Sequence, residues 1–208
     1  MHTRSSRFGC AILAAGVSPR LANGKQAASL EGQPLIQRVT LAACRSRVAR
    51  TAVIVGSRAD EIATAVSNLP IDIISNPLWP EGLASSVRGA VGWARGRHLD
   101  GLLLAIVDHL ALSTAHFDAL VAASEGGLQV VGSTYEGVLG LPALFPRDCY
   151  GRLEGLVGDL DARALLLDAE PDFPHLTINV PRRPLDEPAE LGRREEPPGS
   201  RARPTIRS

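Results

Sequence analysis

The stretch from Cys10 to Gln26, CAILAAGVSPRLANGKQ, decides how the rest of the chain is interpreted. It begins with the apolar run CAILAA, which ends abruptly at Gly16, and this pattern indicates a strand that enters a polar loop. A glycine at that point lets the backbone bend and approach a ligand. Arg20 and Lys25, five residues apart in the loop, can converge on one anion. The stretch therefore predicts a loop that binds a phosphate chain.

Lys25 is the only lysine in a chain with 22 lysine and arginine residues, which favours a specific role for its ammonium group. A solvated loop lysine is the alternative. Two better-known phosphate loops do not match the stretch. A P-loop, G-x-x-x-x-G-K-[ST], is excluded because Pro19 stands five residues before Gly24 and Gln26 follows the lysine. The dinucleotide pattern G-x-G-x-x-G is also missing after the strand.

Length and composition predict one globular α/β domain. The chain has 208 residues, of which 45% are hydrophobic, and a formal net charge of zero, so no basic surface indicates nucleic acid or an anionic membrane as a partner. Three widely spaced cysteines without a C-x-x-C pair favour a reducing, cytoplasmic location. The apolar segment 8–17 is rich in alanine and glycine rather than leucine, which favours a core strand over an export signal. We place the domain at residues 1–191, followed by a disordered tail at 192–208 that is rich in Arg, Glu and Pro.

Apolar runs and helical periodicity alternate along the chain. Pro34 is placed to start a helix, and Gly101 to Val107 is a fully apolar run typical of a strand buried in a parallel sheet. Further strands are expected at 51–55 and 71–74, and further helices at 60–66 and up to about Ala94. These elements predict a doubly wound, Rossmann-like three-layer α/β/α sandwich with a mostly parallel sheet. Ligands bind beyond the carboxyl ends of the strands in such folds, where Gly16 and Asp108 are expected to lie.

Two further segments are candidates for ligand binding. Residues 76–88, NPLWPEGLASSVR, form a proline-containing loop that delivers Ser85 and Ser86 to the start of a helix. There the serines can cap the helix, or the helix can receive a polar ligand on its free N–H groups. Asp108 follows the most apolar strand and is a reasonable Mg²⁺ ligand, with a capping or ion-pairing role as the alternative. His109 has no partner in its motif, and we interpret it as structural, with a role as a ligand or a base as the alternative.

The opening stretch resembles the signature L-A-A-G-x-S-x-R-[ML]-G-x-x-K of nucleotidyltransferases with a MobA-like fold, most closely the molybdenum cofactor cytidylyltransferases. Their fold is of the nucleotide-diphospho-sugar transferase type. The resemblance implies nucleotide contacts from Leu13, Ala14, Ala15, Gly16 and Ser18. The chain departs from the signature at Ala22, where the family has a glycine.

The resemblance extends over about residues 8–191 and assigns roles to further segments. In the family, N-P-x-W-x-x-G-[ML]-x-[ST]-S-[LV]-R-x-G is associated with nucleotide and substrate binding, which implies such roles for Ser85, Ser86 and Arg88. Asp108 corresponds to the first aspartate of a D-Q-P motif and Asp186 to a second metal carboxylate. Departures occur at His109 and Leu110 in the D-Q-P motif, at Leu141 in Y-x-G-x-x-G-[HN]-P-x-L-F, and at Asp161 in L-x-G-D-x-G-A-R.

The resemblance implies transfer of CMP from CTP to a phosphorylated acceptor, molybdopterin or the molybdenum cofactor, with release of pyrophosphate. Arg20 and Lys25 would hold the triphosphate, Mg²⁺ on Asp108 would neutralise the developing charge, and Ala15 would favour a pyrimidine base. The implied partners are these small-molecule substrates and a molybdoenzyme or its chaperone.

Two alternatives stay open at this point. The departures from the family motifs motivate a non-catalytic relative that binds a nucleotide or cofactor as a maturation factor. A nucleotidyltransferase that acts on a sugar phosphate or polyol phosphate is the other alternative. Pyrophosphate release separates the first alternative from the main prediction, and a panel of acceptors separates the second.

Overall fold

The computed structural model describes residues 6–16, 29–30, 33–107, 112–124, 126, 129–135, 138–158, 166 and 176–179. Helices and strands alternate over the first part of the chain. They are β1 (Phe8–Ala14), β2 (Ser29–Leu30), β3 (Gln33–Pro34), α1 (Leu35–Cys44), β4 (Arg50–Val55), α2 (Ala59–Val66), β5 (Asp72–Ser75), the 3-10 turn η2 (Trp79–Glu81), α3 (Leu83–Gly96) and β6 (Gly101–Ile106). The second part contains α4 (Thr114–Ala123), β7 (Val131–Tyr135), β8 (Val138–Pro146), η3 (Arg147–Cys149), α5 (Tyr150–Glu154) and β9 (Leu176–Asn179).

The predicted elements of the first part are present. The four expected strands correspond to β1, β4, β5 and β6, with ends that differ by at most two residues from the prediction. Pro34 precedes the first residue of α1, as expected for a proline whose fixed φ suits a helix start. The helix expected to begin near Ser85 begins earlier, at Leu83, so that both serines lie inside its first turn.

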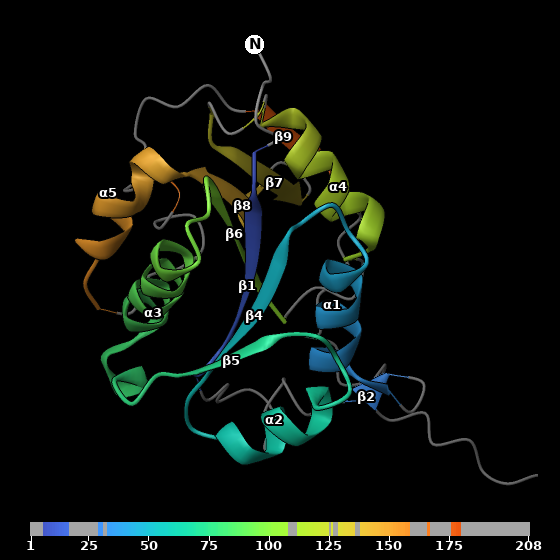
Figure 1. Cartoon of the computed structure of the whole chain (residues 1–208), viewed down its shortest axis with the longest axis vertical. Coiled ribbons are helices and arrows are strands. Elements are labelled where there is room, and N and C mark those ends of the chain that lie inside the picture. Colours follow the sequence, from blue (N-terminus) through green and yellow to red (C-terminus); the bar gives the residue numbers. More distant parts are fainter. Residues whose placement is uncertain are drawn as a thin grey trace, which may run out of the picture.

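Within the described residues, seven strands form one sheet in the order β5-β4-β1-β6-β8-β7-β9 (Figure 1). β1 lies at its centre and pairs in parallel with β4 on one side and β6 on the other. β8 runs antiparallel to both of its neighbours, β6 and β7. The sheet is therefore mostly parallel, and the carboxyl ends of β1, β4 and β6 lie at one edge.

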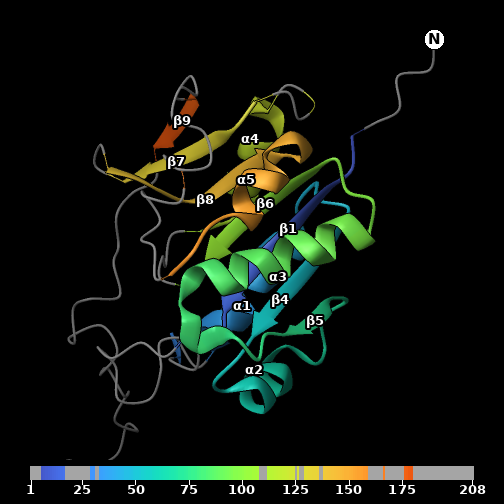
Figure 2. The same ribbon diagram turned by 90° about the vertical axis from the view of Figure 1, so that its left-hand side faces the viewer.

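Helices cover both faces of the sheet, which confirms the three-layer α/β fold. Figures 1 and 2 show α3 and α5 on one face and α1 and α4 on the other. Side chains of β1 alternate between the faces, because successive residues of a strand point to opposite sides. Ala11 and Leu13 join the core beneath α3, whereas Cys10, Ile12 and Ala14 join the core beneath α1.

The three cysteines, all within the described part of the chain, form no disulfide. Cys10 is fully buried in β1, and burial raises the pKa of its thiol, with a smaller contribution from Cys44. The Cys10 thiol therefore stays protonated and serves as a core side chain, although it opens the stretch that leads to the candidate site. Among the described helices, none combines the length and the apolar character that a membrane span requires.

Candidate nucleotide-binding site

A cavity of about 310 Å³ lies where the carboxyl end of β1 meets the start of α3. Its volume is at the small end of the range for ligand pockets. One wall comes from the end of β1 and the residues that follow it, and the other from η2 and the first turn of α3. The lining residues are Leu13, Ala15, Gly16, Trp79, Pro80, Glu81, Gly82, Leu83 and Ser86.

The β1 wall is held from behind by the end of β4. The carbonyl oxygen of Ala15 accepts a hydrogen bond from the Ser57 N–H at 3.1 Å. A Cβ at Gly56 would stand 2.6 Å from that oxygen and 2.8 Å from Cβ of Trp79, so only glycine fits between the two walls. At Gly16, by contrast, a Cβ would meet nothing within 4 Å among the described residues. No described residue therefore fills the space beside Gly16.

Gly82 joins η2 to α3 and sets the shape of the second wall. Its backbone has φ 99° and ψ −174°, a conformation that essentially only glycine adopts. This geometry turns the chain between Glu81 and Leu83, and the N–H of Ala84 in the first turn of α3 donates to the carbonyl of Gly158 at 3.2 Å. At least one helix N–H group that could have received a ligand is thus satisfied by the protein.

We predict that Gly82→Ala lowers the free energy of unfolding by about 1–3 kcal/mol, because a Cβ is strained in this backbone conformation. Gly92→Ala is the matched control, since Gly92 is an exposed residue of the same helix and a Cβ there meets nothing within 4 Å among the described residues. That control should be neutral or stabilising. Urea denaturation followed by circular dichroism measures both variants, and equal stabilities would contradict the strain at Gly82.

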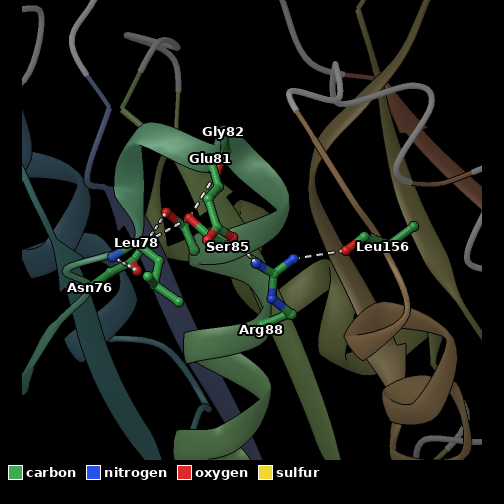
Figure 3. A network of polar contacts seen from close by, with 8 residues as sticks. Asn76, Leu78, Glu81, Gly82, Ser85, Arg88 and Leu156 are labelled. Atoms are coloured by element: carbon green, nitrogen blue, oxygen red, sulfur yellow. Dashed lines mark hydrogen bonds and ion pairs between the residues drawn. The ribbon is translucent and has the colours of Figure 1, made fainter.

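A buried polar network lies behind the second wall (Figure 3). Asn76 follows β5, and its Nδ2 donates to Oγ of Ser85 at 2.9 Å and to Oγ of Ser86 at 3.1 Å. Its Oδ1 accepts the N–H of Leu78 at 3.0 Å. The Ser85 hydroxyl donates in turn to the carbonyl of Gly82 at 2.9 Å. Neither serine makes a side-chain cap hydrogen bond at the start of α3. Their hydroxyls instead connect the helix to the loop.

Arg88 connects three segments around the cavity. Figure 3 shows its guanidinium group between Glu81 and Leu156. Nη2 donates to Oε2 of Glu81 at 2.6 Å, and Nη1 donates to the carbonyl of Leu156 at 2.8 Å. Two terminal nitrogens are therefore engaged with the protein, and the charge of Glu81 on the cavity wall is balanced. This wall has neutral character, which suits an uncharged ring better than a phosphate group.

The β7–β8 hairpin contains the segment that resembles the family motif Y-x-G-x-x-G-[HN]-P-x-L-F. The Leu141 side chain is fully buried in the core beneath α3 and α5, and its carbonyl accepts the Tyr135 hydroxyl at 2.5 Å. Burial raises the pKa of that hydroxyl, so Tyr135 remains a donor. Ser133 Oγ similarly donates to the carbonyl of Pro142 at 2.5 Å. Leu141 therefore serves packing in this chain.

Several predicted site residues lie outside the described residues. These are Ser18, Arg20, Lys25, Asp108 and Asp186, together with the motif departures at Ala22, His109, Leu110 and Asp161 and the segment 192–208. Leu13 at the end of β1 pairs with Ile106 at the end of β6. Gly16 and Val107, the last described residues before Arg20 and Asp108, thus follow neighbouring parallel strands.

The structure brings Leu13, Ala15, Gly16 and Ser86 together in one cavity, whereas Ser85 and Arg88 support its wall. Ala14 points to the opposite face, into the core beneath α1. Sequence reasoning missed Asn76 and Trp79, although both lie in the quoted segment 76–88. The available signal was position, because Asn76 directly follows a strand and polar residues at strand ends commonly reach the ligand crevice.

The described part of the site contains hydrogen-bonding groups rather than a metal cluster. Among the described residues, no group of three or more His, Cys, Asp or Glu side chains could hold a metal ion. The predicted metal ligands Asp108 and Asp186 are not among them. What the described walls can do chemically is enclose a neutral ring and offer it a serine hydroxyl.

Comparisons with known proteins find similar sequences and similar folds. A relative, the purine catabolism protein PucB of Bacillus subtilis (strain 168), is 34% identical over 86 residues, which are 41% of this chain and 41% of that protein. The match therefore spans less than half of the relative's length. The crystal structure of a homologue of Mycobacterium tuberculosis Rv0371c, from Mycobacterium sp. strain JC1, superposes with a TM-score of 0.72 at 25% identity. That alignment covers 90% of this chain and 94% of the homologue.

A third likeness concerns the fold alone. CMP:2-keto-3-deoxy-manno-octonic acid synthetase complexed with CTP superposes with a TM-score of 0.67 at 16% identity, covering 89% of this chain and 95% of the other. The family model of the MobA-like NTP transferase domain matches residues 10–173, a range that contains every residue lining the cavity. Asp186 lies beyond that range. The chain therefore belongs to the MobA-like NTP transferase domain family of nucleotidyltransferases.

Proposed function

We propose that the protein transfers CMP from CTP to a phosphorylated acceptor of the molybdopterin type and releases pyrophosphate. The observation that carries the proposal is the neutral cavity at the end of β1, lined by Ala15 and Ser86. The chain leaves this cavity at Gly16 and continues directly into the segment with Arg20 and Lys25. A nucleobase in the cavity would thus have its triphosphate beside the two cations.

The proposed roles follow from the chemistry of nucleotidyl transfer. Arg20 and Lys25 bind the triphosphate and stabilise the leaving pyrophosphate through charge-assisted hydrogen bonds. Asp108, and Asp186 as a weaker candidate, would hold Mg²⁺, which when bound supplies charge neutralisation at the transferred phosphorus. An acceptor phosphate is already ionised at neutral pH, so the reaction needs no side-chain base. Glu81 is the carboxylate on the described cavity walls, and it is paired with Arg88.

The remaining predicted binding residues contribute in two ways. Leu13, Ala15, Gly16 and Ser86 contact the nucleotide, and Ser18 joins them from the loop. Ser85 and Arg88 shape the site through the contacts described above. The fold supports this assignment, because a protein of the same fold has been solved in complex with CTP. The product would pass to a molybdoenzyme or its chaperone.

The testing experiment measures pyrophosphate release with Mg²⁺, each of the four NTPs in turn, and molybdopterin as the acceptor. Release that depends on both CTP and molybdopterin is the expected result. Nucleotide binding without pyrophosphate release from any acceptor would favour a non-catalytic maturation factor. Release that requires a sugar phosphate or polyol phosphate would keep the reaction type and replace the acceptor.

We predict that CTP is preferred over GTP by at least about tenfold in kcat/KM, equivalent to about 1.4 kcal/mol of differential transition-state binding. Ala15 lines the cavity, and we expect its methyl group to occupy space that a purine would need. Competition between the two nucleotides in one reaction measures the ratio. Ala15→Gly should reduce it, and equal use of CTP and GTP by the natural protein would show that Ala15 does not select the base.

A further inference from the structure

Hydrogen bonds within the protein hold three groups of Asn76: its backbone N–H, its Oδ1 and its Nδ2. Its backbone N–H donates to the carbonyl of Val55 at 2.8 Å, which anchors it at the carboxyl end of β4. The residue is 6% exposed. Because Oδ1 accepts the N–H of Leu78, the amide nitrogen faces the two serines of α3. The orientation of the amide group is therefore set by the protein.

The amide nitrogen imposes a direction on both serine hydroxyls. An amide N–H can only donate, so the oxygens of Ser85 and Ser86 act as acceptors toward Asn76. Each hydroxyl then has its hydrogen left to donate elsewhere. The Ser85 hydrogen is used, since it donates to the carbonyl of Gly82.

The hydroxyl hydrogen of Ser86 differs from that of Ser85 in its surroundings. Ser86 is 4% exposed and lines the cavity together with Ala15 and Gly16. Its oxygen already accepts Asn76 Nδ2 at 3.1 Å, and no acceptor for its hydrogen occurs among the residues that the structure describes. A buried hydroxyl whose hydrogen has no acceptor is costly, and the cost is removed when a ligand supplies that acceptor.

We propose that Asn76 is a positioning residue, which turns the Ser86 hydroxyl into a hydrogen-bond donor directed at an acceptor atom of the bound nucleobase. The inference rests on the proposed function, because it requires a nucleotide in the cavity. It adds a rule of specificity: at this wall the site selects a base edge that carries an acceptor, and it disfavours one that carries a donor. Asn76 acts through Ser86 and does not itself line the cavity.

Asn76→Asp tests the direction of the hydrogen bond. The two side chains are nearly isosteric, and the carboxylate still accepts the N–H of Leu78, but it can only accept from the serines. The Ser86 hydroxyl would then donate to the carboxylate and present a lone pair to the base. We expect the KM for CTP to rise about tenfold with kcat unchanged, because this contact is made equally in the ground state and the transition state.

Two comparisons separate positioning from a general structural effect. Asn68→Asp is the matched control, because Asn68 is exposed and its Oδ1 acts as an acceptor for Gln37 Nε2 at 3.2 Å. It should leave the KM for CTP and kcat unchanged. In a double-mutant cycle, Asn76→Asp should add little to the KM of Ser86→Ala, because the hydroxyl through which Asn76 acts is then absent.

Asn76→Ala keeps the test decisive if Asn76→Asp does not fold. It frees the Ser86 hydroxyl without reversing it, so the rise in KM should be smaller than that of Ser86→Ala and should vanish in the Ser86→Ala background. A rise in KM that persists fully in that background, or an equal loss of kcat, would overturn the positioning role. Calorimetry with CTP separates the two proposals. If the natural protein binds no nucleotide, both proposals are overturned. If the natural protein and Asn76→Asp bind CTP equally tightly, this inference alone is overturned.

Discussion

Asp108→Asn is expected to lower Mg²⁺-dependent pyrophosphate release by about 100-fold or more. Asp108 comes directly after Val107, the last described residue beyond β6, and the end of β6 is paired with the end of β1 beside the cavity. In the proposed function, this carboxylate would hold Mg²⁺ near the α-phosphate. Asparagine is nearly isosteric but uncharged, so the metal would lose its anchor while the core changes little.

Initial rates of pyrophosphate release over a range of Mg²⁺ concentrations measure this effect. Excess Mg²⁺ should restore part of the activity if the carboxylate acts through metal affinity. Asp60→Asn is the control, because Asp60 lies in the first turn of α2 and makes the same change of charge away from the cavity walls. Near-normal release from Asp108→Asn would place the metal on other residues and discredit the alignment of Asp108 with the family's aspartate.

The central strands could be predicted from the sequence because their burial leaves a direct pattern. β1, β4 and β6 are covered on both faces, and each therefore reads as a nearly continuous apolar run. Gly16 and Gly56 stop two of these runs in the sequence, and the ends of the strands follow from them. The position of the cavity follows in turn, since ligands of such sheets bind at the carboxyl ends of the strands.

The reversal of β8 was not predicted, although a signal for it exists. The run from Val138 to Pro146 is as apolar as a buried parallel strand. Only two residues separate it from Tyr135, the last residue of β7. A parallel pair needs a crossover of a dozen or more residues, so such a short connection permits only an antiparallel hairpin. Chain length between strands thus carries information that composition alone does not.

The roles of Ser85, Ser86 and Arg88 could be predicted only in outline. Their segment indicates a loop that leads into a helix, and local rules then favour serines as caps. The observed bonds depend on Asn76, nine and ten residues away, and on Leu156, which is 68 residues from Arg88. Which hydroxyl faces the ligand is decided by this tertiary arrangement, and no local pattern in the sequence contains it.

Lys25→Ala is expected to weaken CTP binding by about 1.5–3 kcal/mol, roughly a factor of 10–150 in Kd, without loss of fold. Lys25 is the single lysine among 22 basic residues, and its segment follows the cavity wall at Gly16. The described walls are neutral, because Arg88 balances Glu81, so the charge of the triphosphate must be met by other residues. Arg20 and Lys25 are the first two cations in the sequence after Gly16.

Isothermal titration with CTP, repeated at low and high salt, measures the loss, and the difference between variant and natural protein should shrink as salt screens the contact. Arg50→Ala is the control for net charge, because Arg50 is exposed at the first residue of β4, at the opposite end of that strand from the cavity. Lys25→Arg keeps the charge and should recover most of the affinity, with any remaining loss reporting a need for a compact ammonium group. If Lys25→Ala bound CTP with the same Kd as the natural protein, the loop would not hold the triphosphate, and the cation for that role would have to come from another segment.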